Sequence, residues 1–111
     1  MKTTTALEKK LPALAQIIGV SVSDLLSHCR KAELVDARSM AVALMMSQPG
    51  VKQEDVAPVL GISQAGVSYL LIRHNGMMHY DDYKQRFAAV EAAAREARKR
   101  ARKTKKEDPD Q

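Results

Sequence analysis

Gln53-Glu-Asp-Val-Ala-Pro-Val-Leu-Gly-Ile-Ser-Gln-Ala-Gly-Val-Ser-Tyr-Leu-Leu-Ile-Arg-His74 is the stretch that decides the fold. Gly61 stands where a first helix must end with a positive φ, and Ser63 stands where a second helix needs an N-cap. The small Ala57 allows the two helices to pack closely, and Val67 fits the angle between them. The other apolar residues recur at helical spacing on both sides of the turn: Val56, Leu60, Ile62, Leu70 and Leu71. The pattern is typical of a helix-turn-helix.

The chain of 111 residues is long enough for one small domain with a modest core. No run of alternating β-branched residues predicts a strand, so we expect an all-α fold. We expect a compact helical domain of about five to six helices with a long C-terminal helix. No apolar run approaches the roughly 20 residues of a membrane span, no signal-peptide pattern occurs, and the single Cys29 suits a reducing compartment. These features predict a cytoplasmic protein.

The start of the chain allows two interpretations. Pro12 is unfavourable inside a helix, so we expect a helix from Pro12 to Ile18, ended by Gly19, with residues 1–11 as an N-terminal arm. Alternatively, residues 1–11 start the first helix, because Thr5-Ala-Leu-Glu8 has the form of a capping box and predicts a helix that bends at Pro12. Either way, an ordered helix is expected up to Ile18.

Two further helices are expected before the quoted stretch. Ser21 or Ser23 is placed to cap a short helix over residues 24–30, in which Leu25 and Leu26 are expected to be buried. Residues 31–34 are expected to connect it to a longer helix over residues 35–48. One broad apolar face of that helix is formed by Val35, Met40, Leu44 and Met45. Pro49-Gly50 is expected to end it.

Inside the quoted stretch, Pro58 fits the first helix only if the proline lies in the first turn, where its missing N–H costs no hydrogen bond. We therefore expect Asp55 to be the N-cap of that helix. Asn75-Gly76 is expected to close the second helix. The helix-turn-helix domain is thus predicted to span residues 12–79.

The last helix is expected over residues 80–103, with Asp81 and Asp82 at the positive end of its dipole. An apolar seam of heptad type runs along it: Tyr80, Tyr83, Phe87, Val90, Ala94, Ala97 and Ala101. The first half of the seam is expected to dock on the domain core, and the alternative is a dimerising coil. Residues 104–111 are expected to form a disordered charged tail.

The sequence holds no constellation typical of an enzyme or a metal site. His28 and Cys29 are neighbours, so on a helix their side chains point about 100° apart. No zinc-ligand spacing and no glycine-rich phosphate loop occurs, and Asp81-Asp82 is explained by the start of a helix. We predict a protein that is not an enzyme and that has no cofactor and no metal.

The outward-facing residues of the second helix are the candidates for recognition. In a DNA-binding helix-turn-helix this helix lies in the major groove with its N-terminal residues at the base edges. Gln64 can pair with an adenine in bidentate fashion, and Ala65 can meet a thymine methyl. The polar residues around them suit phosphate oxygens: Ser63, Ser68 and Tyr69. Ile72 and Arg73 follow one turn later, and simple solvent exposure is the alternative for Gln64 and Ser68.

Gly66 lies inside this second helix, where it costs about 1 kcal/mol relative to alanine. That cost suggests a neighbour close to the backbone. The neighbour is either DNA or the preceding helix.

A second signal is Val22-Ser-Asp-Leu-Leu-Ser-His-Cys-Arg-Lys-Ala-Glu-Leu-Val-Asp-Ala-Arg-Ser-Met-Ala-Val-Ala-Leu44. It resembles the C-terminal DNA-binding domain of the bacterial replication initiator DnaA. In that family a short helix ending in Leu-Leu-Ser precedes a basic Arg-Lys loop and a helix that opens with Ala-Arg. With the helix-turn-helix, the resemblance covers residues 12–73 and implies a compact all-helical DNA-binding domain of bacterial or phage type.

The resemblance also implies roles for three basic residues. Arg30 and Lys31 would reach toward the minor groove, whose negative potential favours such side chains. Arg38 would lie on the phosphate side or have a structural role. An intramolecular partner such as Asp24 or Asp36 is the alternative for Arg38.

The residues that would read bases depart from that family. Ser63-Gln-Ala-Gly stands where the family has a sequence of Arg-Asp-His-Thr-Thr type. The turn is one residue shorter, which is closer to the Trp-repressor type of spacing. The resemblance therefore covers the scaffold and not the base-reading residues.

The net charge of +5 is unevenly distributed. Residues 1–94 carry ten basic and nine acidic side chains, a balance of +1, and residues 95–111 carry eight basic and four acidic side chains, a balance of +4. A DNA-binding body must therefore depend on local clusters of cations.

Two functions of different classes are expected. The first is binding of double-stranded DNA through the helix-turn-helix and the upstream basic loop, in regulation or replication on the nucleoid. The second is a non-enzymatic protein-interaction or dimerisation module whose basic tail binds nucleic acid without specificity. Its homodimer would form through residues of the C-terminal helix: Tyr80, Tyr83, Phe87 and Val90.

Overall fold

The structure is a computed structural model that describes the backbone of residues 2–106 and the side chains of residues 3–100. The described residues form six helices and no strand: α1 (Lys2–Ile18), α2 (Val22–Leu26), α3 (Ala32–Met46), α4 (Gln53–Leu60), α5 (Gln64–Met77) and α6 (Asp81–Lys106). The predicted all-α fold of five to six helices with a long C-terminal helix is confirmed.

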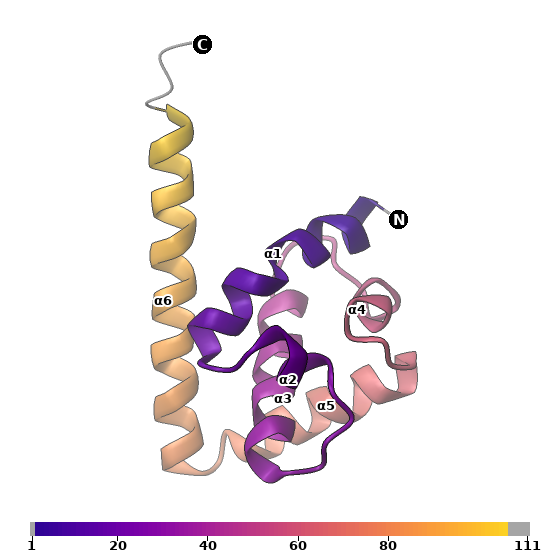
Figure 1. The fold of residues 1–111 in the computed structure, drawn as a ribbon. Helices are drawn as coiled ribbons and strands as arrows, with labels where there is room; N and C mark the ends of the chain where they lie inside the picture. Colours follow the sequence, from indigo (N-terminus) through magenta and orange to yellow (C-terminus); the bar gives the residue numbers. More distant parts are fainter. Residues whose placement is uncertain (1, 107–111) are drawn as a thin grey trace.

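The centre of the fold is α3, which contacts α1, α2, α4 and α5. Its consecutive residues Met40, Ala41 and Val42 are all buried, so the helix is enclosed on more than one side. Figure 1 shows α5 crossing one end of α3, while α6 stands along one side of the body and extends beyond it. The sequence prediction of residues 35–48 for this helix began three residues late and ended two residues late.

The first helix, α1, begins at Lys2 and continues through Pro12. The expected N-terminal arm is therefore wrong, because residues 2–11 belong to the helix, as the alternative predicted. Leu7, Leu11 and Ala15 recur every four residues and are buried in the core. Burying two leucines stabilises the helix by roughly 3–6 kcal/mol, which offsets the roughly 3 kcal/mol that an internal proline costs. Gly19 ends α1 as expected, with a φ of 96°.

The short helix α2 is capped by Ser21, whose side chain accepts a hydrogen bond from the Asp24 N–H at 3.0 Å. It ends at Leu26, so the expected helix up to residue 30 is wrong. Leu25 is buried as predicted, but Leu26 is 38 % exposed and the prediction for it is wrong. Because α2 is so short, it turns only one leucine inward.

The N-terminus of α4 differs from the sequence prediction. Lys52 is the N-cap, and Asp55 is the third helical residue, whose carboxylate accepts the Lys52 N–H at 2.9 Å. Pro58 therefore lies in the second turn and not the first. The Thr4 hydroxyl donates to the Asp55 carbonyl at 2.9 Å, which ties α1 to α4.

The turn between α4 and α5 agrees with the prediction. Gly61 ends α4 in the left-handed conformation, with φ 65° and ψ 34°. Ser63 caps α5, and its hydroxyl accepts the Gly66 N–H at 3.0 Å. The helix α5 continues to Met77, so Asn75-Gly76 does not close it.

The two helices bend by 99° at this turn. Within the described residues no single helix has the length and apolarity needed to cross a membrane, and α4 with α5 has them only as this bent pair.

The first half of α6 docks on the core of the domain, as expected from its apolar seam. Tyr83, Phe87 and Val90 are buried against Met40 and Leu44 of α3. Of the remaining seam, Ala94 is half-buried in the same cluster, whereas Tyr80 and Ala97 are exposed and the Ala101 side chain lies outside the description. The helix includes residues 104–106, so the expected disorder there is wrong, and residues 107–111 lie outside the described part.

Candidate nucleic-acid interface

The loop after α2, residues Ser27–Lys31, is fixed by one arginine of α3. The Arg38 guanidinium donates to the Leu25 carbonyl at 3.1 Å, the Cys29 carbonyl at 2.8 Å, the Asp24 carbonyl at 3.4 Å and the Ser27 hydroxyl at 2.9 Å. Its side chain is only 8 % exposed. Arg38 therefore has a structural role, and its Asp24 partner is the backbone carbonyl and not the carboxylate.

This loop, called the basic loop below, faces α5 across an open groove of about 600 Å³. Four of the sequence-predicted residues line the groove: Arg30, Arg38, Tyr69 and Arg73. The remaining predicted residues are not part of its lining: Lys31, Ser63, Gln64, Ala65 and Ser68. The fold thus brings the basic loop beside α5, although Arg30 and Tyr69 are 39 positions apart in the sequence.

The groove carries a positive charge. Arg73 is paired with the Asp36 carboxylate at 3.0 Å, so its charge is largely compensated. Arg38 is bonded to carbonyl and hydroxyl oxygens only, and no carboxylate pairs with it within the described residues. Arg30 is exposed at the groove. Two arginine charges therefore remain without a counter-charge, which favours an anion in the groove.

The outward face of α5 presents a mixed surface. Gln64 and Ala65 are exposed, and Tyr69 and Ile72 are 59 % and 71 % exposed. Ser68 donates its hydroxyl to Gln53 Oε1 of α4 at 2.5 Å. This bond occupies the Ser68 proton and had no signal in the sequence, because the two residues lie on different helices.

The hydroxyl of Ser63 is likewise engaged, because it caps α5. Gly66 has ordinary van der Waals room beside it, since a Cβ there would lie 3.4 Å from Ile62. The preceding segment therefore does not require a glycine at this position.

The inward face of α5 is joined to α6 through His74. His74 Nδ1 lies 2.8 Å from the Tyr83 hydroxyl, and its ring meets those of Tyr83 and Phe87 edge to face. Burial lowers the pKa of His74 below 6.5, although Glu91 acts in the opposite direction. Burial also raises the pKa of Tyr83 to about 12, with a smaller contribution from the charge of Asp36.

The role of His74 was not predicted from the sequence, although a signal for it existed. Val67, Leu70 and His74 follow each other at steps of three and four, which places them on one face of α5. In contrast, the Arg73–Asp36 ion pair joins residues 37 apart and had no local signal.

The described residues contain no group of three His, Cys, Asp or Glu side chains arranged to hold a metal ion. No protein-family model matches the chain, and no curated protein or solved structure matches it at a significant level.

Proposed function

We propose that this protein binds double-stranded DNA, with α5 in the major groove and the basic loop at the neighbouring backbone and minor groove. The observation that carries the proposal is the placement of the positively charged basic loop beside the exposed face of α5. Phosphate contacts by such a loop would set the register, and the helix would contact the base edges.

The geometry of α4 and α5 supports this proposal. Their 99° bend lies within the roughly 90–120° of DNA-binding helix-turn-helix motifs. Gln64 and Ala65 lie in the first turn of α5 and are exposed, as base-reading residues must be. A glutamine amide suits adenine and an alanine methyl suits the thymine methyl, so A·T pairs are the expected targets.

The residues proposed for DNA binding are those that the fold leaves accessible. Arg30 and Lys31 would contact the backbone or minor groove, Gln64 and Ala65 would read bases, and Tyr69 would contact phosphate. Arg38 would position the basic loop, and the hydroxyls of Ser63 and Ser68 already have intramolecular partners. Arg73 would face DNA with its charge largely compensated by Asp36. The resemblance to the replication-initiator domain supports a regulatory or replication-linked role on the nucleoid.

The test is fluorescence anisotropy with a labelled random-sequence duplex over a series of salt concentrations, using the full chain. The double variant Arg30→Ala/Lys31→Ala is compared with Lys9→Ala/Arg95→Ala, which removes one lysine and one arginine that are also exposed but lie on α1 and α6. If the basic loop contacts two phosphates, the loop variant reduces the slope of log K against log salt by about two, and the control changes it much less.

Equal losses in the loop variant and the control would contradict the proposal, because binding would then depend on total charge alone. If the loop result holds, a selected binding site gives a second test. We expect Gln64→Ala to cost about 1–3 kcal/mol on that site and to relax specificity at one base pair. If Gln64→Ala left the affinity for every DNA sequence unchanged, α5 would not read bases through Gln64.

A specific observation also favours the alternative, a protein-interaction module. Tyr69 and Ile72 are large apolar side chains exposed on the same face of α5. The homodimer through α6 stays a prediction, but Tyr83, Phe87 and Val90 are buried within one protomer, so only Tyr80 of that set is available without undocking α6. A dimer in sedimentation velocity, together with no DNA binding at low salt, would favour this function.

A further inference from the structure

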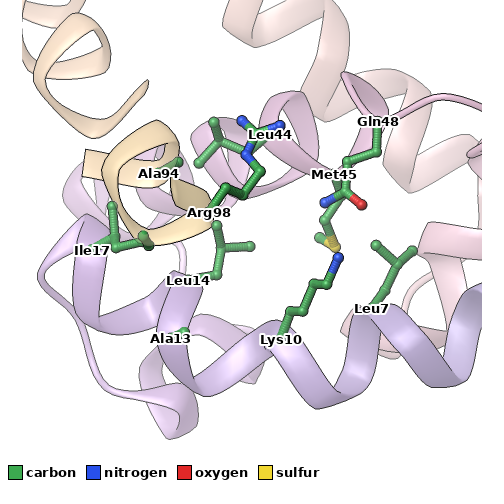
Figure 2. A pocket seen from close by; sticks show the side chains of 11 residues that line it. Leu7, Lys10, Ala13, Leu14, Ile17, Leu44, Met45, Gln48, Ala94 and Arg98 are labelled. Carbon is green, nitrogen blue, oxygen red and sulfur yellow. The ribbon is translucent and has the colours of Figure 1, made fainter. Parts of the chain in front are cut away.

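A second groove lies on another part of the molecule, between α1, the end of α3 and the second half of α6. Its volume is about 240 Å³, and its floor is apolar: Leu7, Leu14, Ile17, Leu44 and Met45. In Figure 2, Leu14 and Ile17 lie beside the α6 ribbon, whereas Met45 and Leu7 lie farther along α1, on the Lys10 side. The groove lies where the two buried clusters of the fold meet, because Leu7 and Met45 belong to one cluster and Leu44 and Ala94 pack in the other.

The groove is open because the residues that could fill it are alanines. Ala13 of α1 and Ala94 and Ala97 of α6 line it, and a methyl group is too short to close the space between the two helices. Leu14 and Ile17 are therefore only half-buried, whereas Leu7, Leu44 and Met45 behind them are buried. Covering the exposed parts of Leu14 and Ile17 would be favourable.

The rim of the groove is cationic. Lys10 of α1 and Arg98 of α6 line it together with the amide of Gln48, and its lining contains no carboxylate. In Figure 2 the polar ends of Lys10 and Gln48 lie on the Met45 side, and the guanidinium of Arg98 lies on the Leu44 side. Within the described residues these three side chains have no hydrogen-bond or ion-pair partner.

We propose that this groove binds a small apolar carboxylate, with its hydrocarbon body on the leucine and methionine floor and its carboxylate at the cationic rim that Lys10 and Arg98 form. The volume is below the roughly 300–1,000 Å³ of sites for drug-sized ligands, which limits the ligand to a short chain or a small ring system. Both cations supply N–H donors, and such charge-assisted hydrogen bonds to a carboxylate are the strong ones. Acid binding in this groove would be independent of DNA binding.

The test is isothermal titration calorimetry of the full chain with decanoate and with 2-naphthoate, a flexible and a flat acid, below concentrations that form micelles. We expect saturable 1:1 binding of at least one acid. Decan-1-ol, which lacks the charge, is expected to bind at least about tenfold more weakly than decanoate if decanoate is the acid that binds. Methyl-¹³C labelling of methionine locates the ligand, because Met45 lines the groove and Met77 does not.

Two pairs of variants assign the contacts. Lys10→Met/Arg98→Met is expected to weaken acid binding at least about tenfold, and its control Lys9→Met/Arg95→Met leaves it unchanged. Ala97→Leu fills the groove from an exposed position and is expected to abolish binding, whereas the exposed Ala93, which does not line the groove, gives the matched control Ala93→Leu.

Three outcomes would overturn the proposal. The first is that neither acid binds saturably. The second is that Ala97→Leu binds as tightly as the unmodified chain. The third is a concentration-dependent dimer that Ala97→Leu dissociates without any acid binding, which would assign the groove to a second copy of the chain.

Discussion

The two faces of α5 have opposite chemistry. On the inward face, Val67, Leu70 and His74 are buried against the rest of the fold and against α6. On the outward face, Tyr69 and Ile72 are among the most exposed large apolar side chains of the described chain. Both faces carry bulky apolar residues, so the hydrophobicity of the sequence alone does not distinguish them.

The inward residues of α5 pack the helix against the rest of the fold, whereas the outward residues are accessible to a partner. An inward residue contributes to stability, because its removal leaves a cavity. An outward residue contributes little to stability, so a substitution there would matter only for binding. Paired substitutions on the two faces can therefore test the assignment.

The largest effect is expected from truncating the inward face. Leu70→Ala should lower the free energy of unfolding by about 3 kcal/mol, because it removes a buried side chain. Ile72→Ala, two residues away on the outward face, should change it by less than about 0.5 kcal/mol. Urea denaturation followed by circular dichroism measures both. A loss above about 1 kcal/mol for Ile72→Ala would mean that something covers this residue in solution.

A smaller effect, which depends on pH, is expected at His74. Because burial lowers its folded-state pKa, the unfolded chain binds the proton more readily. The stability that neutral His74 contributes is fully present above about pH 6.5 and is lost as pH falls from there through the lowered pKa. Urea midpoints at pH 7.5 and 5.5 should therefore differ less in His74→Gln than in the unmodified chain.

The matched control for this pH experiment is His79→Gln, because His79 is exposed and, within the described residues, makes no ring contact and no side-chain hydrogen bond with α6. It should keep the pH dependence of the unmodified chain. An unaltered difference between the two pH values in His74→Gln would exclude His74 as its source.

The smallest effect is expected from Gly66→Ala. Alanine favours a helix by up to about 1 kcal/mol over glycine, and the added Cβ meets Ile62 at an ordinary 3.4 Å. Gly76→Ala, with no atom within 4 Å of its Cβ, should raise stability by a similar amount. Thermal unfolding measures both, and a clear loss of stability for Gly66→Ala would show that Ile62 cannot adjust. Gly66 lines the groove beside the basic loop and Gly76 does not, so only Gly66→Ala is expected to weaken DNA binding.

The sequence predicted the parts of the fold that depend on local chemistry. Gly61 and Ser63 were placed correctly because a left-handed C-cap and a side-chain N-cap are properties of single residues and their close neighbours. The docking of Tyr83 and Phe87 was predictable from their spacing along one face of α6.

Two of the wrong predictions have different causes. Pro12 was expected to begin a helix, but Leu7 and Leu11 bury enough area against other helices to keep the chain helical around it. Leu26 was expected to be buried together with Leu25 in a helix that continues to residue 30, but α2 ends at Leu26 and leaves it 38 % exposed. At Pro12, contacts with distant segments outweighed the local preference, whereas at Leu26 the helix ended earlier than expected.

In the candidate site, too, some features followed from the sequence and others only from the tertiary structure. The sequence alone determined that the chain is helical, where the turn at Gly61 lies and which residues α5 could present. Only the tertiary structure decided that the Arg38 guanidinium would bind the backbone of the basic loop and that Asp36 would pair with Arg73. It also decided that Arg30 would lie exposed beside α5. Helix formation depends on neighbours a few residues apart, whereas the partner of a charged side chain depends on which distant segments the buried core brings within hydrogen-bonding distance.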